Sequence, residues 1–237
     1  MANFITRNVP NTLTCGNLVS GCIAATHAFS GMYEWAFLFI VIGAVFDFFD
    51  GMSARLLGVS SPIGKELDSL ADCVTFGVAP SAMVFTLLST LELPASLLPV
   101  GAIVPYWAFL MAAFSALRLA KFNLDERQTS SFIGLPTPAN ALFWASLIVG
   151  AENLISCSPY MSLCVMAMVV LSCWLLVAEL PMFSLKFKHW GWSGNEVRYI
   201  FIVVSALLLA VLRLSGFAAV IAFYVVYAVC INKFQKK

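Results

Sequence analysis

The sequence predicts an all-α fold, a polytopic bundle of about eight transmembrane helices. Three observations support this: an apolar excess, apolar stretches long enough to cross a bilayer, and basic residues gathered on one side of those stretches. Of the 237 residues, 61% are hydrophobic and 11% are charged, and the mean hydropathy is +0.93. Soluble domains do not carry such an excess, so we expect an integral membrane protein. The formal net charge of +1 argues against a polybasic nucleic-acid binder.

Eight apolar stretches are long enough to cross a bilayer, which takes about 20 residues of helix. In chain order they cover residues 12–29, 33–56, 66–89, 98–121, 136–153, 160–184, 197–213 and 215–233. The first is the most polar and is the weakest candidate for a complete crossing. No soluble domain fits between them, so residues 1–237 are expected to form a single integral membrane domain. Its core would cover about residues 8–190, followed by a helical hairpin at about residues 196–233.

Short connections with turn-forming residues separate these stretches. Residues 30–31, 91–92 and 152–153 lie in three of them, and residues 56–62 between the second and third contain Gly58 and Pro62. A polar loop at residues 123–135 precedes the fifth stretch, whose start is fixed by Pro136 and Pro138. The last two stretches are separated only by residues 214–216, which predicts a tight hairpin.

The basic residues predict the side of the membrane that each connection faces. If the N-terminus is cytoplasmic, only Arg213 lies on the far side, and the outer connections near residues 30–31, 91–92 and 152–153 carry no basic residue. The other basic residues are then at or near the cytoplasmic face: Arg7, Arg55, Lys65, Arg118, Lys121, Arg127, Lys186, Lys188, Arg198, Lys233, Lys236 and Lys237. An even number of spans agrees with this bias, so both termini are expected inside.

Four of the five aspartates lie within 26 consecutive residues, at the predicted cytoplasmic ends of the second and third stretches. Asp47 and Asp50 are three residues apart, and Asp68 and Asp72 are four apart, so each pair shares one helix face. The short connection between the two helices sets these acidic faces against each other. Ionisable groups at membrane depth are costly, so the cluster indicates a functional site.

Two divalent cations with oxygen ligands would neutralise these four carboxylates, which would otherwise repel one another and take up protons. Two metals bridged by aspartates suit displacement at phosphorus, because they hold a diphosphate and stabilise the leaving oxygen. Gly51 and Ala54 agree with this, since a larger side chain there would keep a nucleotide from lying against the helix. Arg55 offers a bidentate fork to a phosphate.

Two other interpretations of the acidic cluster have less support. Helix-end aspartates could pair with Lys65 and Arg55 on a wet surface, but four acids beside two small residues argue against this. An ion pathway in a transporter predicts acids in several helices, whereas the later stretches have almost none at mid-depth. The seven cysteines form no CxxC pair and the chain has two histidines, so no zinc site is expected.

The residues from Asp47 to Asp72 follow the pattern D-x-x-D-G-x-x-A-R-(x)8-G-x-x-x-D-x-x-x-D. The chain therefore resembles the CDP-alcohol phosphatidyltransferases, whose signature it matches at every defined position. The resemblance implies that the four aspartates bind two divalent metals, Mg2+ or Mn2+, and that Asp72 is also the base for the incoming alcohol. It implies that CDP contacts Gly51, Ala54 and Arg55.

Further segments resemble the bacterial phosphatidylserine synthases within that family: residues 10–14 with Asn17, 68–80, 118–123 and 132–139. This resemblance covers about residues 8–190 and implies a phospholipid-biosynthesis enzyme. It would transfer the phosphatidyl group of CDP-diacylglycerol to the hydroxyl of L-serine, giving phosphatidylserine and CMP. It also implies that the protein lies in the bacterial inner membrane with its active site facing the cytoplasm. The expected partners are membrane lipids and a second copy of the chain, and no nucleic acid is expected to bind.

Serine is a zwitterion, so its carboxylate needs a cation and its ammonium an acceptor, while its hydroxyl needs a base. Asp72, one turn beyond Asp68, is the candidate base. Arg118 and Lys121 lie on successive turns with Asn123 beside them, and together with Thr137 they are the candidates for binding serine. Arg118 and Lys121 would alternatively anchor the helix to lipid headgroups. On the first helix, the spacing of Asn11, Thr14 and Asn17 points toward the nucleotide, or toward hydrogen bonds between helices.

The residues alone leave the alcohol acceptor open. Glycerol 3-phosphate, inositol phosphate and choline would take part in the same chemistry. A phosphorylated acceptor would need more basic residues than the four near the site, which are Arg55, Lys65, Arg118 and Lys121. A cation-coupled transporter is the alternative of a different class, and it would show divalent-dependent flux without release of CMP.

Overall fold

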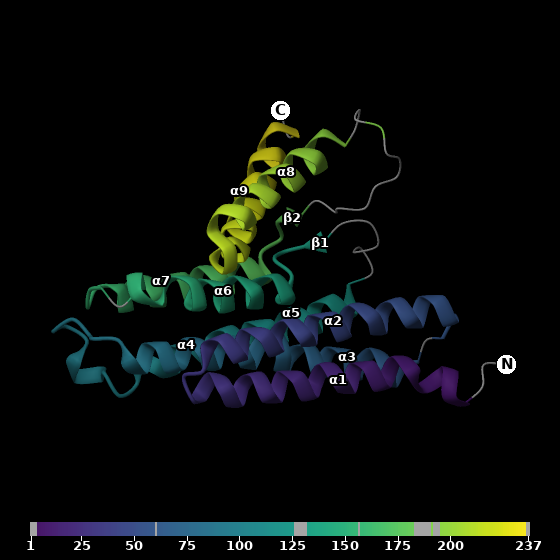
Figure 1. Ribbon diagram of the computed structural model, residues 1–237, viewed down its shortest axis with the longest axis horizontal. Coiled ribbons are helices and arrows are strands. Elements are labelled where there is room, and N and C mark those ends of the chain that lie inside the picture. Colours follow the sequence, from purple (N-terminus) through teal and green to yellow (C-terminus); the bar gives the residue numbers. More distant parts are fainter. Residues whose placement is uncertain are drawn as a thin grey trace.

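Helices account for most of the computed structural model (Figure 1). It describes residues 4–59, 61–125, 132–155, 157–182, 191 and 195–235. The helices are α1 (Phe4–Phe29), α2 (Tyr33–Leu57), α3 (Pro62–Asp72), η1 (Cys73–Val78), α4 (Ala79–Thr90), η2 (Leu98–Val100), η3 (Val104–Phe109), α5 (Leu110–Leu124), α6 (Thr137–Ile155), α7 (Met161–Val177), α8 (Glu196–Leu212), η4 (Arg213–Ser215) and α9 (Gly216–Gln235). Strands β1 (Phe132–Ile133) and β2 (Pro181–Met182) add one antiparallel pair. The predicted all-α class is confirmed, with this pair as a small addition.

The helices form two layers and a protruding hairpin (Figure 1). One layer holds α1, α2, α5 and the continuous α3–η1–α4 helix, and α6 and α7 lie over it, with α6 against α2 and α7 against α5. Trp144 of α6 is fully buried and donates from Nε1 to Ser172 Oγ of α7 at 2.9 Å. The hairpin of α8 and α9 leans away from the other helices and contacts α6.

Three helical stretches of the described chain are long and apolar enough to cross a membrane: Tyr33–Leu57, Pro62–Thr90 and Glu196–Ile231. Two shorter apolar helices cover Thr137–Ala151 and Met161–Val177. The polar α1 is not among these, in keeping with its prediction as the weakest span. Its polar residues Thr14, Asn17 and Ser20 are buried in the structure. The number of spans remains a prediction.

The stretch Glu196–Ile231 folds back on itself at Arg213, where φ is 51°. The ring of Phe201 lies 5.9 Å from that of Phe223 and 5.6 Å from that of Tyr224. In a straight helix Phe201 and Phe223 would be about 33 Å apart. The predicted tight hairpin is therefore confirmed.

The prediction of a single α-helix over residues 98–121 was wrong. It begins as the two 3₁₀ segments η2 and η3, each with a proline in its first turn, and becomes α-helical only at Leu110. Pro99 and Pro105 lack the backbone N–H that an α-helix interior requires, so the regular helix starts after them.

The sixth predicted stretch, residues 160–184, also ends early, at Val177. The backbone N–H groups of Gly134 and Leu135 donate to Leu180 O and Leu175 O, each at 2.9 Å, which draws the chain after α7 into the β1–β2 pair. Gly134 has φ +75°, and a Cβ there would lie 2.9 Å from Leu176 O. Only glycine fits this crossing of the two segments.

The connection between α2 and α3 is a tight turn, as predicted. Gly58 ends α2 in the left-handed conformation, with φ 60°. Ser61 caps α3 by accepting a hydrogen bond from Gly64 N at 3.0 Å, and Pro62 occupies its first turn. These end signals bring the last turns of α2 beside the first turns of α3.

The helix after Asp72 widens into a π-helical segment, η1. Ala79 N–H donates to Val74 O, five residues back, and Pro80 follows. In a regular α-helix the ring of Pro80 would clash with the carbonyl of Phe76, so the wider turn accommodates the proline. The widening lies directly after the acidic motif and contains Thr75.

Small residues let α1, α2 and η1 approach closely around Thr75. Thr75 Oγ1 donates to Asn17 O at 3.0 Å. A Cβ on Gly21 would lie 2.7 Å from Thr75 Cα, and a Cβ on Gly43 would lie 3.0 Å from Asn17 Oδ1. This contact fixes Asn17 beside Asp72, so the packing of these three helices positions part of the acidic site.

Replacing Gly21 with alanine is expected to destabilise the protein by about 1–3 kcal/mol, because the new methyl group overlaps backbone that cannot move easily. Thermal unfolding of the purified protein in detergent should show a lower Tm. Gly51→Ala is the matched control, since a Cβ there meets only Arg55 Nη1, at 3.8 Å. Equal Tm values for the two variants would contradict the proposed packing.

Candidate functional site

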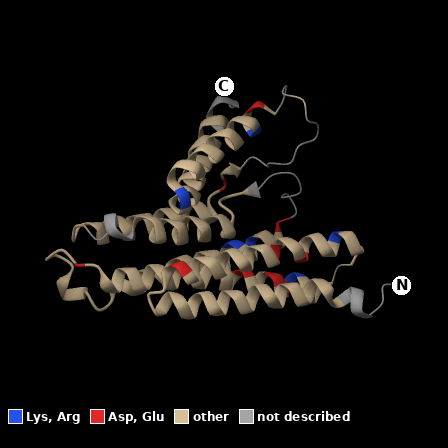
Figure 2. Cartoon of the chain, in the orientation of Figure 1, with Lys and Arg blue, Asp and Glu red and all other residues tan. Residues whose placement is uncertain are grey.

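Charged residues gather toward the end of the lower layer where α2 passes into α3 (Figure 2). Some of the basic residues that predicted the orientation are outside the described part of the chain: Arg127, Lys186, Lys188, Lys236 and Lys237. The same holds for residues 126–131 of the polar loop. Orientation across a membrane therefore stays a prediction.

Three of the four predicted metal ligands converge. Asp47, Asp50 and Asp68 each offer a carboxylate oxygen, and these oxygens all lie within 4.8 Å of one another. The predicted spacing explains the convergence, because Asp47 and Asp50 share a face of α2 and Asp68 faces them from α3. Asp50 is buried and the other two are half-buried, so their mutual repulsion is poorly screened by water.

Asp72, one turn further along α3, is set apart from this group of three. It is buried, and its Oδ1 accepts a hydrogen bond from Asn17 Nδ2 at 3.0 Å. The structure therefore gives Asp72 a different environment from its neighbours, although α2 and α3, which carry the four aspartates, both pack against α1.

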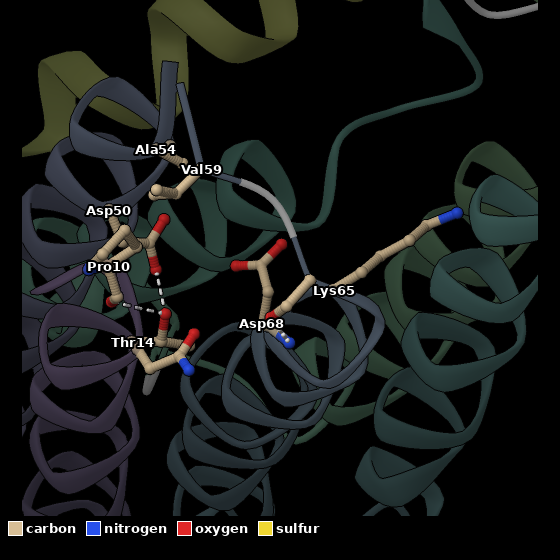
Figure 3. A pocket seen from close by; sticks show the side chains of 11 residues that line it. Pro10, Thr14, Asp50, Ala54, Val59, Lys65 and Asp68 are labelled. Carbon is tan, nitrogen blue, oxygen red and sulfur yellow. Dashed lines mark hydrogen bonds between the residues drawn. The ribbon is translucent and has the colours of Figure 1, made fainter. Parts of the chain in front are cut away.

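Helix α1 closes the acidic site from the side. Thr14 Oγ1 lies 2.6 Å from Asp50 Oδ2, to which it donates, and 3.0 Å from Pro10 O (Figure 3). Both Thr14 and Asn17 were predicted to face the nucleotide or to bond neighbouring helices. In the structure each of them bonds an aspartate of the motif, so α1 orients two of the four carboxylates.

A cavity of about 200 Å³ opens beside the aspartates. Asp50 and Asp68 point into it from opposite sides, and Ala54 and Thr14 form part of its wall (Figure 3). Its lining consists of Pro10, Asn11, Thr14, Asp50, Gly51, Ala54, Val59, Ser61, Gly64, Lys65 and Asp68. The residues predicted to contact CDP thus border one space, except for Arg55, which is exposed, and Asn17, which is fully buried.

The donor set fits divalent cations. Carboxylate oxygens are the ligands that Mg2+ and Mn2+ prefer. Asp68 Oδ1 is buried without a hydrogen-bond partner, and so is Asn17 Oδ1. Buried acceptors without partners are costly, and a bound cation would satisfy the carboxylate.

Lys65 does not neutralise the acids. Its side chain runs away from them toward α5, where Nζ donates to Asn123 O at 2.8 Å (Figure 3). Asn123 Nδ2 in turn donates to Ser69 Oγ at 2.8 Å. Asn123, a predicted serine ligand, therefore holds α5 against α3.

The other predicted serine ligands are divided between two places. Arg118 and Lys121 line a second, smaller cavity of about 60 Å³ between α5 and the segment after α7. Thr137, at the start of α6, is buried with Oγ1 lacking a partner and is not among the residues that line this cavity. The structure thus brings Arg118 and Lys121 together, and leaves Asn123 and Thr137 outside their cavity.

Several residues that border the two cavities were not predicted. Ser61 and Val59 come from the α2–α3 turn, and Pro10 comes from α1. Asp125 and Glu179 line the second cavity with Arg118 and Lys121. The serine cap pattern before α3 was legible in the sequence, whereas nothing in the spacing brings Glu179 near Arg118.

Comparison with known proteins agrees with the motif. A family model described as CDP-alcohol phosphatidyltransferase matches residues 7–182. A Bacillus subtilis relative is 40% identical over 131 residues, which is 55% of this chain and 69% of that protein. A Methanocaldococcus jannaschii relative is 29% identical over 223 residues, 93% of this chain and 92% of that protein. A Helicobacter pylori relative is 35% identical over 135 residues, which cover 56% of this chain and 54% of that protein. All three are named CDP-diacylglycerol–serine O-phosphatidyltransferase.

Proposed function

The chain belongs to the CDP-alcohol phosphatidyltransferase family, and on this premise we propose that it transfers the phosphatidyl group of CDP-diacylglycerol to L-serine. The serine hydroxyl oxygen forms a bond to the β-phosphorus, the bond from that phosphorus to CMP breaks, and the hydroxyl proton passes to a carboxylate. The products are phosphatidylserine and CMP. One observation carries the proposal: three aspartates of the family motif converge beside a cavity of about 200 Å³.

The larger cavity is the proposed CDP site. Gly51 and Ala54 give it a wall without bulky side chains, so the nucleotide can lie against α2. Arg55, which is exposed, is available to a phosphate oxygen as a bidentate donor. Thr14 borders the cavity directly, while Asn17 acts through the carboxylate that it holds.

Asp47, Asp50, Asp68 and Asp72 would hold two divalent ions, Mg2+ or Mn2+. Such ions, when bound, offset the charge of the diphosphate and of the leaving phosphate oxygen. The protein's own contribution is to hold three carboxylates within 4.8 Å of one another in a half-buried site, fixed by the α2–α3 turn and by Thr14. That preorganisation is what a polar transition state requires of its surroundings.

Asp72 is the proposed general base. Its Oδ1 accepts from Asn17, which fixes the carboxylate plane and leaves Oδ2 for the serine proton. Burial keeps bulk water from competing for that proton. Serine needs this help because its hydroxyl is a weak nucleophile near neutral pH.

The membrane setting is part of the same proposal. The protein would lie in a bacterial inner membrane, and its basic residues favour an orientation in which the active site and both termini face the cytoplasm. A homodimer is proposed from the family resemblance alone. Crosslinking in native membranes, with cysteine accessibility measured from each side, tests the dimer and the orientation.

The direct test is purified protein with CDP-diacylglycerol, Mn2+ and a panel of alcohols, with CMP release as the readout. We expect release to require both L-serine and the metal. Release of CMP with glycerol 3-phosphate but not with serine would show that serine is the wrong acceptor, and it would leave the family assignment unchanged. Divalent-dependent flux into vesicles without CMP release would favour the transporter alternative.

Gly51→Ala is expected to raise the KM for CDP-diacylglycerol by about tenfold, since one methyl group in a tight site is worth about 1–3 kcal/mol. The fold tolerates the change, because the new Cβ meets only Arg55 Nη1 at 3.8 Å. Steady-state kinetics measures the KM, and thermal unfolding should show an unchanged or slightly raised Tm. An unchanged KM would indicate that the nucleotide does not lie against this wall.

A further inference from the structure

The second cavity carries charges of both signs around a small volume. Arg118 and Lys121 come from α5, Asp125 follows that helix, and Glu179 follows α7. We propose that this cavity is a zwitterion-selective subsite for the amino-acid acceptor, in which Arg118 binds the carboxylate of L-serine and Glu179 binds its ammonium group. This inference rests on the proposed function and names the residues that select its acceptor.

Arg118 is the anchor of the subsite. Its side chain is only 8% exposed, yet Nε has no hydrogen-bond partner, and Cζ lies 5.9 Å from the centre of the Phe122 ring. A buried guanidinium with an unused donor is costly, and a carboxylate is the partner that matches its planar fork. Burial and the nearby Phe122 ring restrict the guanidinium before the ligand arrives.

Glu179 and Lys121 stand at the mouth of the cavity, where both are exposed. L-Serine therefore reaches the subsite from water, and the charged heads guide it in. In an α-amino acid the carboxylate and the ammonium share one carbon, so a receptor must offer a cation and an anion side by side. One cavity of about 60 Å³ bordered by Arg118 and Glu179 meets that requirement.

The same charges disfavour the other acceptors that the sequence leaves open. Glycerol 3-phosphate and inositol phosphate carry no cation for Glu179, and choline carries no carboxylate for Arg118. Each of them would leave one charged group of the cavity without its partner, whereas L-serine satisfies both. A site whose polar groups are left unpaired by the wrong ligand discriminates against that ligand.

The subsite adjoins the proposed base. Helix α5, which carries Arg118, packs against η1 and α3, and Asp72 lies where these two segments join. A serine held by its two charged groups at Arg118 and Glu179 can thus direct its hydroxymethyl group toward Asp72.

The kinetic test compares Glu179→Gln with the wild-type protein. We expect the KM for L-serine to rise by about tenfold or more, the effect of losing a charge-assisted hydrogen bond, while kcat and the KM for CDP-diacylglycerol stay within about twofold. Glu179→Asp, which keeps the charge, should recover part of the loss. Glu92→Gln makes the same charge change at an exposed residue beyond the far end of α4, and its serine KM should equal that of the wild type.

Two serine analogues separate the two contacts. 3-Hydroxypropanoate lacks the ammonium group and ethanolamine lacks the carboxylate. Glu179→Gln should reduce the preference for serine over 3-hydroxypropanoate and leave the preference over ethanolamine unchanged. Arg118→Ala should do the reverse, and equal loss of both preferences in both variants would overturn the proposal.

Binding of L-serine itself, followed by saturation-transfer NMR on the full-length protein, distinguishes the two levels of inference. If the wild type binds serine and Glu179→Gln weakens that binding, the subsite stands even without CMP release. If CMP release requires serine but Glu179→Gln changes neither serine binding nor its KM, the subsite is overturned and the proposed function stands. Absence of serine binding in the wild type also overturns the subsite.

Discussion

Replacing Asp72 with asparagine is expected to lower kcat for CMP release by about 10²–10⁴-fold, the usual contribution of a general base. The introduced amide keeps the shape of the side chain and can still accept from Asn17, whose Nδ2 lies 3.0 Å from Asp72 Oδ1. It cannot take up the serine proton. Steady-state CMP release measures kcat, and the KM for CDP-diacylglycerol should change by no more than about twofold.

Asn17→Ala is the companion variant, because it keeps the carboxylate but removes the hydrogen bond that orients it. Its kcat should fall by less than that of Asp72→Asn, and its Tm should show whether the helix contact survives. Wild-type turnover in Asp72→Asn would remove Asp72 as the base. A large rise in the KM for CDP-diacylglycerol with little change in kcat would place it at the nucleotide instead.

Removing the divalent metal is expected to abolish turnover and to lower the stability of the protein. Three carboxylate oxygens within 4.8 Å of one another repel when no cation lies between them. A ligand present at 100 times its Kd stabilises the folded state by about 2.7 kcal/mol. Titration of the metal-free protein with Mn2+, followed by electron paramagnetic resonance and by thermal unfolding, measures binding and stability separately from turnover.

The double variant Asp47→Asn, Asp68→Asn gives this prediction a sharper form. It should bind Mn2+ at least tenfold more weakly, and its metal-free Tm should exceed that of the metal-free wild type because two repelling charges are gone. Glu66→Gln, an exposed residue of the same helix α3 outside the group, is the control for loss of charge. Wild-type Mn2+ binding by the double variant would place the metals elsewhere.

The fold class and the residues of the acidic motif could be predicted from the amino-acid sequence alone. Apolar stretches long enough to span a bilayer predict helices, and most of these stretches are α-helical in the structure, although residues 98–109 are not. The i, i+3 and i, i+4 spacing of the aspartates placed each pair on one helix face, and Gly58 and Pro62 marked the turn that joins the two faces. These are local properties, set by helix geometry and by the backbone preferences of individual residues.

The boundaries that the sequence missed depend on contacts with other segments. Helix α7 ends at Val177, although apolar residues continue, because Leu175 O in its last turn and Leu180 O just beyond it accept hydrogen bonds from Leu135 and Gly134 of a distant segment. Residues 98–109 are as apolar as a helix requires, but their prolines divide them into 3₁₀ turns. Hydropathy indicates which residues are buried in lipid or protein, but it does not indicate which backbone groups form hydrogen bonds with one another.

Which side chains meet at the site depends on how the helices pack. Thr14 reaches Asp50 across 36 residues of sequence, and Asn17 reaches Asp72 across 55. The structure also separated Asp72 from the other three aspartates and brought Glu179 to the cavity of Arg118. Such meetings depend on how helices cross and rotate against one another, which follows from the packing of glycines and bulky side chains over the whole bundle. A spacing rule within one helix carries no information about that rotation.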